Sequence, residues 1–146
     1  MTLALERPRT GQGRIIVPLD LAQEEKLLAL VGQLDGRVGL AKVGKELFTA
    51  LGPRAVAAVR ESGLEVFLDL KYHDIPNTVA GAVRAAAKLG VSMLTVHAQG
   101  GRAMLAAAVA AARQSDPSPA IIAVTVQTSL AESDLAELGE IGRAHV

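Results

Sequence analysis

The sequence contains no cysteine and no tryptophan, and its aromatic residues are one tyrosine and two phenylalanines. The absence of cysteine excludes disulfide bonds, thiolate nucleophiles, zinc ribbons and iron–sulfur clusters. The 15 basic and 15 acidic side chains balance and form no basic cluster, which argues against nucleic-acid binding. No stretch approaches the ~18 consecutive apolar residues of a membrane span. Glu6, Arg7 and Arg9 interrupt the N-terminus where a signal peptide would be apolar, so we expect a cytoplasmic protein.

Apolar segments of two lengths alternate along the chain, and 50% of its residues are hydrophobic, enough for one packed domain. The short segments are continuous apolar runs, typical of strands buried on both faces, and they span residues 14–19, 39–43, 65–70, 92–96 and 120–126. The long segments have helical spacing, and they span residues 21–34, 53–61, 76–89 and 101–114. The pattern predicts five βα units, with the fifth helix barely begun.

Polar side chains follow the predicted strands where each one ends. A doubly wound sheet concentrates its site at one switch point, whereas a barrel collects polar groups at the ends of successive strands. The strand ends carry Asp20, Lys42, Asp69, Lys71, His97, Thr125 and Thr128. The glycine patterns of common nucleotide-binding loops are absent. We therefore predict an α/β protein with a (β/α)8 TIM-barrel fold, of which the chain supplies about five of eight units.

The densest group of charged residues is the string DLKYHD at positions 69–74. Residues two apart on a strand point to the same face, so Asp69 and Lys71 should project together, and Lys42 should reach them from the neighbouring strand. A carboxylate between two ammonium groups keeps the charges paired and leaves one ammonium able to donate a proton. A purely structural ion-pair cluster is the alternative interpretation.

Five segments of the chain form long strings in a fixed order. They read IIVPLD (15–20), KVGKELFTALGP (42–53), FLDLKYHDIPNT (67–78), TVHAQGG (95–101) and AVTVQTS (123–129). From Arg14 to Gly139 the chain resembles the bacterial form of the orotidine 5'-phosphate decarboxylase family. Departures are small: Pro18 and Gln99 stand where the family more often has alanine and serine, and Gln127 stands where leucine is common.

The resemblance implies a reaction and a set of catalytic residues. The reaction is decarboxylation of orotidine 5'-monophosphate to uridine 5'-monophosphate in de novo pyrimidine synthesis, without a metal or an organic cofactor. Lys71 would donate the proton to C6 of the pyrimidine, and Asp69 would lie near the departing carboxylate. Asp74 would reach the site of the partner subunit in a homodimer, and Lys42 would complete the charged network.

The resemblance also assigns the residues that bind the substrate. Lys42 and Asp20 would hold ribose hydroxyls, Thr78 would act from the partner's loop, and Thr128 would contact the pyrimidine. The full substrate-binding set comprises Asp20, Lys42, Asp69, Lys71, Asp74, Thr78 and Thr128. The expected partners are the small-molecule substrate and a second copy of the protein, with no nucleic acid and no membrane.

Three segments are expected along the chain: an N-terminal extension over 1–13, a partial barrel domain over 14–139 and a C-terminal piece over 140–146. Residues 140–146 match the translation of a common sequencing adapter, so we interpret them as read-through. In the family, the second half of the barrel supplies the phosphate grip and a closing loop. We therefore expect a C-terminally truncated chain that is inactive alone and leaves its first and fifth strands with unpaired edges.

Two alternatives to this enzyme stay open. One is a metal-dependent sugar-phosphate decarboxylase or aldolase of the same barrel group, which shares the D-x-K-x-x-D pattern. Lys42 in K-V-G and the contiguous D-I-P-N-T favour the metal-free enzyme over it. The other is a non-catalytic half-barrel that binds a phosphorylated ligand or a complementary fragment. His73 and His97 are interpreted as solvated or structural and are left out of the catalytic set.

Overall fold

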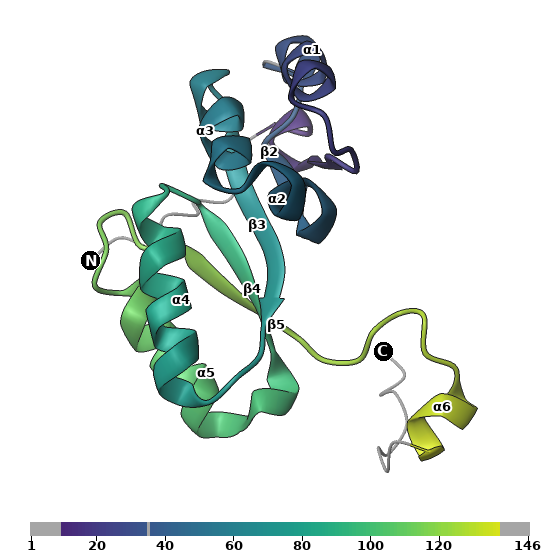
Figure 1. Cartoon of the computed structure of the whole chain (residues 1–146), viewed down its shortest axis with the longest axis vertical. Helices are drawn as coiled ribbons and strands as arrows, with labels where there is room; N and C mark the ends of the chain where they lie inside the picture. The colour runs from purple at the N-terminus through teal and green to yellow at the C-terminus, as the bar shows by residue number, and fades with distance from the viewer. Residues whose placement is uncertain (1–9, 35, 138–146) are drawn as a thin grey trace.

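The computed structural model describes residues 10–34 and 36–137, whose strands form one parallel sheet (Figure 1). The bounds of the strands are β1 Ile16–Pro18, β2 Leu40–Gly44, β3 Glu65–Tyr72, β4 Met93–His97 and β5 Ala120–Val124. Neighbours in space are neighbours in sequence, in the order β1-β2-β3-β4-β5. A doubly wound sheet reverses its strand order at the switch point, so this sequential order is that of a barrel wall. All five predicted strands are present, with β1 and β5 shorter than predicted.

Helices make the crossovers that parallel pairing requires. Four of them confirm predicted helices: α1 Glu24–Leu34, α3 Pro53–Glu61, α4 Pro76–Lys88 and α5 Gly101–Ala112. A short helix, α6 Glu132–Glu137, follows β5, where the pattern predicts a helix barely begun. The sequence pattern does not predict three further elements: α2 Lys45–Leu51 and the 3-10 helices η1 Gln12–Arg14 and η2 Ala98–Gly100.

The break between α2 and α3 has a local cause. Gly52 has φ +59°, a conformation that side-chain-bearing residues rarely adopt, and its N–H donates to the carbonyl of Phe48 at 2.7 Å. Pro53 then occupies the start of α3, where a missing N–H costs no hydrogen bond. The two helices therefore meet at a turn instead of continuing as one.

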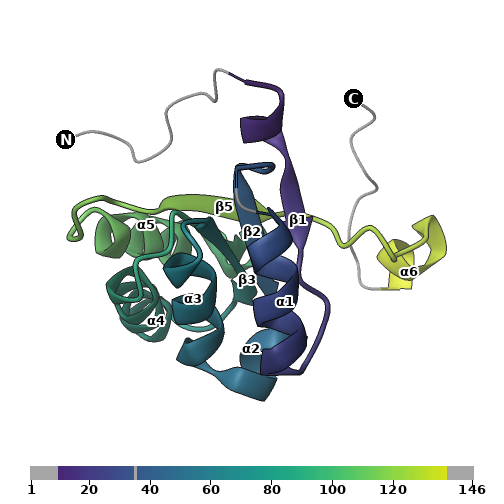
Figure 2. The same ribbon diagram turned by 90° about the horizontal axis from the view of Figure 1, so that it is seen from above.

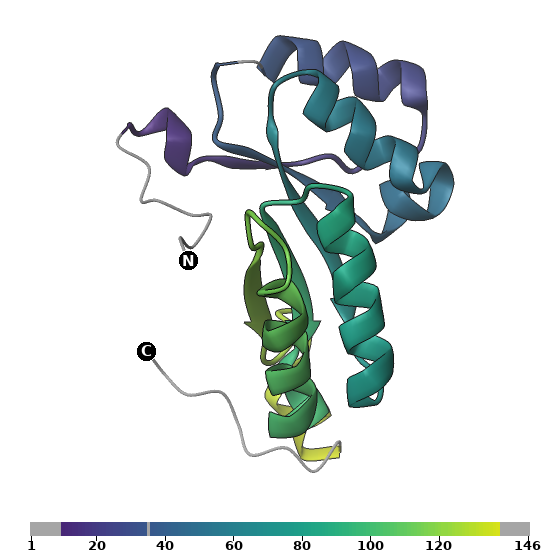
Figure 3. The same cartoon turned by 90° about the vertical axis from the view of Figure 1, so that its left-hand side faces the viewer.

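The helices α1, α3, α4 and α5 lie on one face of the sheet, with α4 and α5 side by side (Figures 2 and 3). Helix α6 is set apart from them beyond the end of β5 (Figure 1). The core lies between the helix layer and the central strands and includes Leu27, Val31, Val43, Leu47, Val56, Val59, Val66, Leu68, Val79, Val83, Leu94 and Met104. None of the helices in the described ranges is long and apolar enough to cross a membrane.

Burial separates the central strands from the outer ones. Strands β2, β3 and β4 are largely buried, whereas β1 and β5 each pair on one side only and carry exposed side chains. Ile16 of β1 and Ile122 of β5 are 39% and 40% exposed. Within the described residues, β1 and β5 therefore each leave one edge without a paired strand, as the pattern predicts.

Candidate functional site

Three charged side chains from two neighbouring strands form one ion-paired group at the C-terminal end of the sheet. Lys42 lies on β2, and Asp69 and Lys71 lie on β3. The Nζ of Lys71 donates to Oδ1 of Asp69 at 2.8 Å, and the Nζ of Lys42 donates to Oδ2 at 3.3 Å. The Asp69 side chain is 11% exposed and the two lysine side chains are 27–28% exposed. We call these residues the Lys–Asp–Lys group.

The backbone of β3 departs from regular strand geometry at this group. The register between β3 and β4 shifts between Leu68 and Tyr72, and Lys71 has φ +54°. Among the described residues, Lys71 alone combines a side chain with a positive φ. Alternation along a regular strand is therefore not what brings Asp69 and Lys71 together: a bulge redirects the lysine. Strained backbone conformations of this kind are concentrated at functional sites, and they persist only because the surrounding structure holds them.

A fourth residue, which sequence reasoning missed, connects to the group from β4. Thr95 is buried, and its hydroxyl donates to Oδ1 of Asp69 at 2.9 Å. The same hydroxyl oxygen accepts the backbone N–H of Lys71 at 2.9 Å. In the sequence Thr95 stands inside an apolar run, so only the register of β4 against β3 reveals its contacts.

The surroundings of Asp69 favour its ionised form. Burial alone would raise the pKa of this carboxyl, but hydrogen bonds from Lys71 and Thr95, the positive charge of Lys71 and the hydrogen bond from Lys42 together outweigh burial and lower it below its ordinary value of 3.8. Asp69 is thus a carboxylate at neutral pH, with both oxygens occupied by cationic donors.

This lowered pKa predicts a pH dependence of stability. The folded-state pKa of Asp69 lies below the unfolded-state value, so its contribution to the free energy of unfolding is present above the unfolded value and is lost as the pH falls through the folded value. In urea unfolding from about pH 6 down to about pH 3, the free energy of unfolding should fall less steeply in Asp69→Asn than in the wild type. Equal slopes in the two proteins would contradict this assignment.

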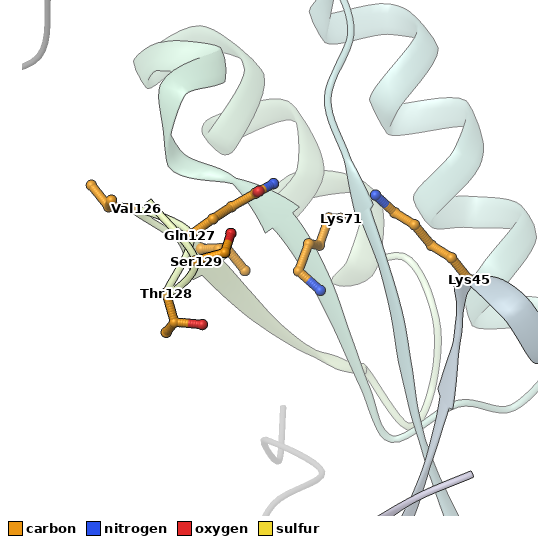
Figure 4. A pocket seen from close by; sticks show the side chains of 7 residues that line it. Lys45, Lys71, Val126, Gln127, Thr128 and Ser129 are labelled. Atoms are coloured by element: carbon orange, nitrogen blue, oxygen red, sulfur yellow. The ribbon is translucent and has the colours of Figure 1, made fainter. Parts of the chain in front are cut away.

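An open pocket of about 380 Å³ lies beside Lys71. Lys71 and Lys45 stand on one side of it, and the segment after β5 stands on the other (Figure 4). The lining residues are Lys45, Lys71, Val124, Val126, Gln127, Thr128 and Ser129. Thr128 thus lies across the pocket from the catalytic candidate Lys71. Lys45, at the start of α2, is a second ammonium group here, and sequence reasoning did not single it out because α2 was not predicted.

The other candidate residues lie outside the Lys–Asp–Lys group. Asp20 is exposed in the segment after β1, and its carboxylate lies near Gly44 at the end of β2. Asp74 is exposed after β3, and its Oδ1 accepts the backbone N–H of Ile75 at 2.6 Å. Thr78 is exposed in the first turn of α4. No hydrogen bond or ion pair joins Asp20, Asp74 or Thr78 to the group within the part of the chain that the structure describes.

Two histidines lie close to the site. The ring centroids of His73 and His97 are 5.4 Å apart. Burial, followed by the nearby charges of His73, Lys45 and Lys71, lowers the pKa of His97 below its ordinary value. His97 Nδ1 is buried without a hydrogen-bond partner in the described chain. The lowered pKa favours the neutral imidazole, whereas the unpartnered Nδ1 departs from a structural histidine with all its hydrogen bonds made.

Within the ranges 10–34 and 36–137, no group of three or more His, Asp or Glu side chains is arranged to hold a metal ion. The carboxylate best placed at the C-terminal end of the sheet, Asp69, is instead engaged by Lys42, Lys71 and Thr95. The charged groups that the structure gathers here are two ammonium groups around one carboxylate.

Comparison with known proteins places this chain in a family. The sequence model of the Orotidine 5'-phosphate decarboxylase / HUMPS family matches residues 13–145. The chain belongs to this family. Among curated relatives, the orotidine 5'-phosphate decarboxylase of Idiomarina loihiensis is 57% identical over 127 residues, which cover 86% of this chain and 54% of the relative. That of Moorella thermoacetica is 58% identical over 128 residues, covering 82% and 50%.

Solved structures agree on the fold. The orotidine 5'-phosphate decarboxylase of Lactobacillus acidophilus superposes with a TM-score of 0.78 at 37% identity, covering 87% of this chain and 59% of that one. An uncharacterized conserved protein of Geobacillus kaustophilus gives 0.75 at 40% identity, covering 88% and 61%. The chain spans about half the length of the curated relatives it matches. Its sheet and helices are accordingly part of the TIM barrel of orotidine 5'-phosphate decarboxylases.

Proposed function

We propose that this chain carries the Lys–Asp–Lys site of an orotidine 5'-phosphate decarboxylase, a lyase that converts orotidine 5'-monophosphate to uridine 5'-monophosphate in pyrimidine synthesis. The observation that carries the proposal is Asp69 held between two ammonium groups, with Lys71 at the edge of an open pocket. Family membership supports the same activity.

The chemistry of the reaction matches these groups. Breaking the bond between C6 and the carboxylate releases carbon dioxide and leaves the electron pair on C6. A fixed ammonium directed at C6 stabilises this charge as it develops and then transfers a proton to the carbon. In the proposal Lys71 is that ammonium, and the resulting neutral amine regains its proton from solvent.

The neighbours of Lys71 have supporting roles in this proposal. Asp69 keeps Lys71 and Lys42 in place through ion pairs and lies near the substrate carboxylate before it departs. Lys42 and Asp20 hold ribose hydroxyls. Thr128, which lines the pocket on the side opposite Lys71, contacts the pyrimidine.

The proposal includes a homodimer in the cytoplasm. Asp74 is exposed just before α4 and Thr78 is exposed in its first turn, both apart from the Lys–Asp–Lys group of their own chain. This position suits side chains that complete the site of a partner subunit. In a completed barrel, an Asp74→Ala protein that sediments as a dimer but has lost turnover would support this role, and one that keeps full turnover would contradict it.

Turnover requires the rest of a barrel in this proposal. About half the length of the curated relatives has no counterpart in these 146 residues. Contacts to remote parts of a substrate, such as its phosphate, support the reaction at the reacting carbon, so we expect the chain alone to turn over little or no substrate. A chimera provides the missing part: residues 1–139 of this chain followed by the Idiomarina loihiensis relative beyond its matched residues.

The test of the function is turnover by this chimera. Loss of the ultraviolet absorbance of orotidine 5'-monophosphate, with uridine 5'-monophosphate identified as the product, is the expected result. A soluble, folded chimera that leaves this substrate unchanged would refute the proposal. Turnover of a sugar phosphate instead would favour the metal-dependent alternative.

Removal of divalent metals provides an independent prediction. Both oxygens of Asp69 are occupied by ammonium donors, and the proposed mechanism assigns charge stabilisation to Lys71. Turnover by the chimera should therefore stay unchanged, within about twofold, after dialysis against EDTA. A loss that added Mg²⁺ restores would contradict the metal-free mechanism.

A further inference from the structure

At the bulge, β3 and β4 have different numbers of residues between the same two pairs. Leu68 pairs with Leu94 and Tyr72 pairs with Val96, so β3 has three residues between these pairs and β4 has one. The three residues of β3 include Asp69 and Lys71 of the Lys–Asp–Lys group. The single residue opposite them is Thr95. Its side chain therefore occupies the place where regular backbone pairing is interrupted.

The hydroxyl of Thr95 makes two hydrogen bonds whose directions are fixed. A backbone N–H can only donate, so the Thr95 oxygen accepts from Lys71, at 2.9 Å. The hydroxyl proton is then free to donate to Oδ1 of Asp69, also at 2.9 Å. That Oδ1 is the atom to which Lys71 Nζ donates. One hydroxyl thus links the backbone of Lys71 to the carboxylate that holds the side chain of Lys71.

The burial of this hydroxyl makes its two hydrogen bonds necessary. Thr95 is 2% exposed, and its neighbours on β4, Leu94 and Val96, are fully buried apolar residues. A buried hydroxyl without partners is costly, and a strand accommodates valine equally well at such a position. Thr95 fits the core only because Asp69 and Lys71 satisfy its hydroxyl.

We propose that Thr95 is a positioning residue, whose hydroxyl holds the bulge of β3 in the conformation that aims Lys71 and fixes Asp69. Lys71 has φ +54°, a conformation that costs free energy and persists only where neighbouring groups hold it. Without the hydroxyl, the Lys71 amide loses its acceptor and Asp69 loses one donor. The consequence for catalysis rests on the proposed function, whereas the consequence for the bulge does not.

The experiment compares Thr95→Val, which removes the hydroxyl at similar size, with Thr95→Ser, which keeps it. In the 146-residue chain, hydrogen exchange of the Lys71 amide should be roughly fivefold to tenfold faster in Thr95→Val, the equivalent of one hydrogen bond. The Ser92 amide, which donates to the Val66 carbonyl at 2.9 Å, is the internal reference and should not change. Thr95→Ser should restore slow exchange at Lys71.

A titration of the Asp69 carboxyl by carbon NMR gives a second readout. The hydrogen bond from Thr95 favours the ionised carboxyl, so the titration should move to higher pH in Thr95→Val and return in Thr95→Ser. Unchanged exchange and unchanged titration in a folded Thr95→Val chain would overturn the proposal. If Thr95→Val does not fold, the wild-type chain decides: a protected Lys71 amide supports the proposal, and an unprotected one overturns it.

The kcat and KM of the chimera test whether the conformation of the bulge affects catalysis. Thr95→Val should lower kcat roughly tenfold to 100-fold with a smaller change in KM, because a misaimed catalytic group affects the reacting step. Thr95→Ser should recover most of kcat. An unchanged kcat beside faster Lys71 exchange would overturn the positioning role. A wild-type chimera without turnover would refute the proposed function, while the exchange and titration results would still decide what Thr95 does in the bulge.

Discussion

Lys71→Ala should abolish measurable turnover in the chimera, with a loss on the order of 10³-fold or more. The substitution removes both the charge that stabilises the developing carbanion and the proton that replaces carbon dioxide. Asp69 keeps hydrogen bonds from Lys42 and Thr95, so the fold should survive the change. The measurement is the rate of absorbance loss of orotidine 5'-monophosphate at saturating substrate.

A matched lysine controls for the loss of a charge. Lys26 is exposed on α1, on the outer helix layer, and Lys26→Ala should leave the rate within about twofold of the wild type. Comparable rates in Lys71→Ala and the wild type would remove Lys71 from the mechanism and leave the Lys–Asp–Lys group as a structural ion-pair cluster.

Asp69→Asn should lower turnover by roughly 10²-fold to 10³-fold. The amide is almost the same size, but it carries no charge, so Lys42 and Lys71 lose the carboxylate that holds them and repel each other. The NH2 group of the asparagine would also face the lysine ammonium groups, which are hydrogen-bond donors and cannot accept a hydrogen bond. Initial rates and KM for the variant chimera, together with its circular dichroism spectrum, separate misplaced lysines from an unfolded protein.

The control for Asp69→Asn lies on the same strand. Glu65 begins β3 and is exposed, so Glu65→Gln removes one carboxylate from the far end of that strand without touching the site. It should leave turnover within about twofold of the wild type. An Asp69→Asn rate as high as that of Glu65→Gln would show that the carboxylate is dispensable, contrary to the proposed arrangement.

The sequence predicts the elements where local signals are strong. Pro53 and Pro76 begin helices α3 and α4 at the predicted residues, because proline is preorganised for the first helical turn. Local signals are weaker in the segment after β2. Its helical part, α2, starts directly after the strand with Gly44 as its N-cap, and no polar capping side chain marks the boundary.

The charged residues of the candidate site can be predicted from the sequence, but the backbone conformation that positions them cannot. The spacing of Asp69 and Lys71 and the neighbouring position of Lys42 predict that the three side chains meet, although the bulge, and not regular alternation, brings Asp69 and Lys71 together. The spacing cannot show that β3 has three residues where β4 has only Thr95, because register depends on pairing between distant segments. The contacts of Thr95 and the positive φ of Lys71 follow from that register, so they emerge only in the folded chain.

The most direct test of the proposed decarboxylase activity assays this chain and the missing part of the barrel as separate polypeptides. The 146-residue chain, the remaining part of the Idiomarina loihiensis relative, and their mixture are each assayed with orotidine 5'-monophosphate. We predict no turnover by either piece alone, turnover by the mixture, and none by a mixture made with Lys71→Ala. A soluble complex of the two pieces that forms no uridine 5'-monophosphate, or one that forms it equally fast with Lys71→Ala, would contradict the account.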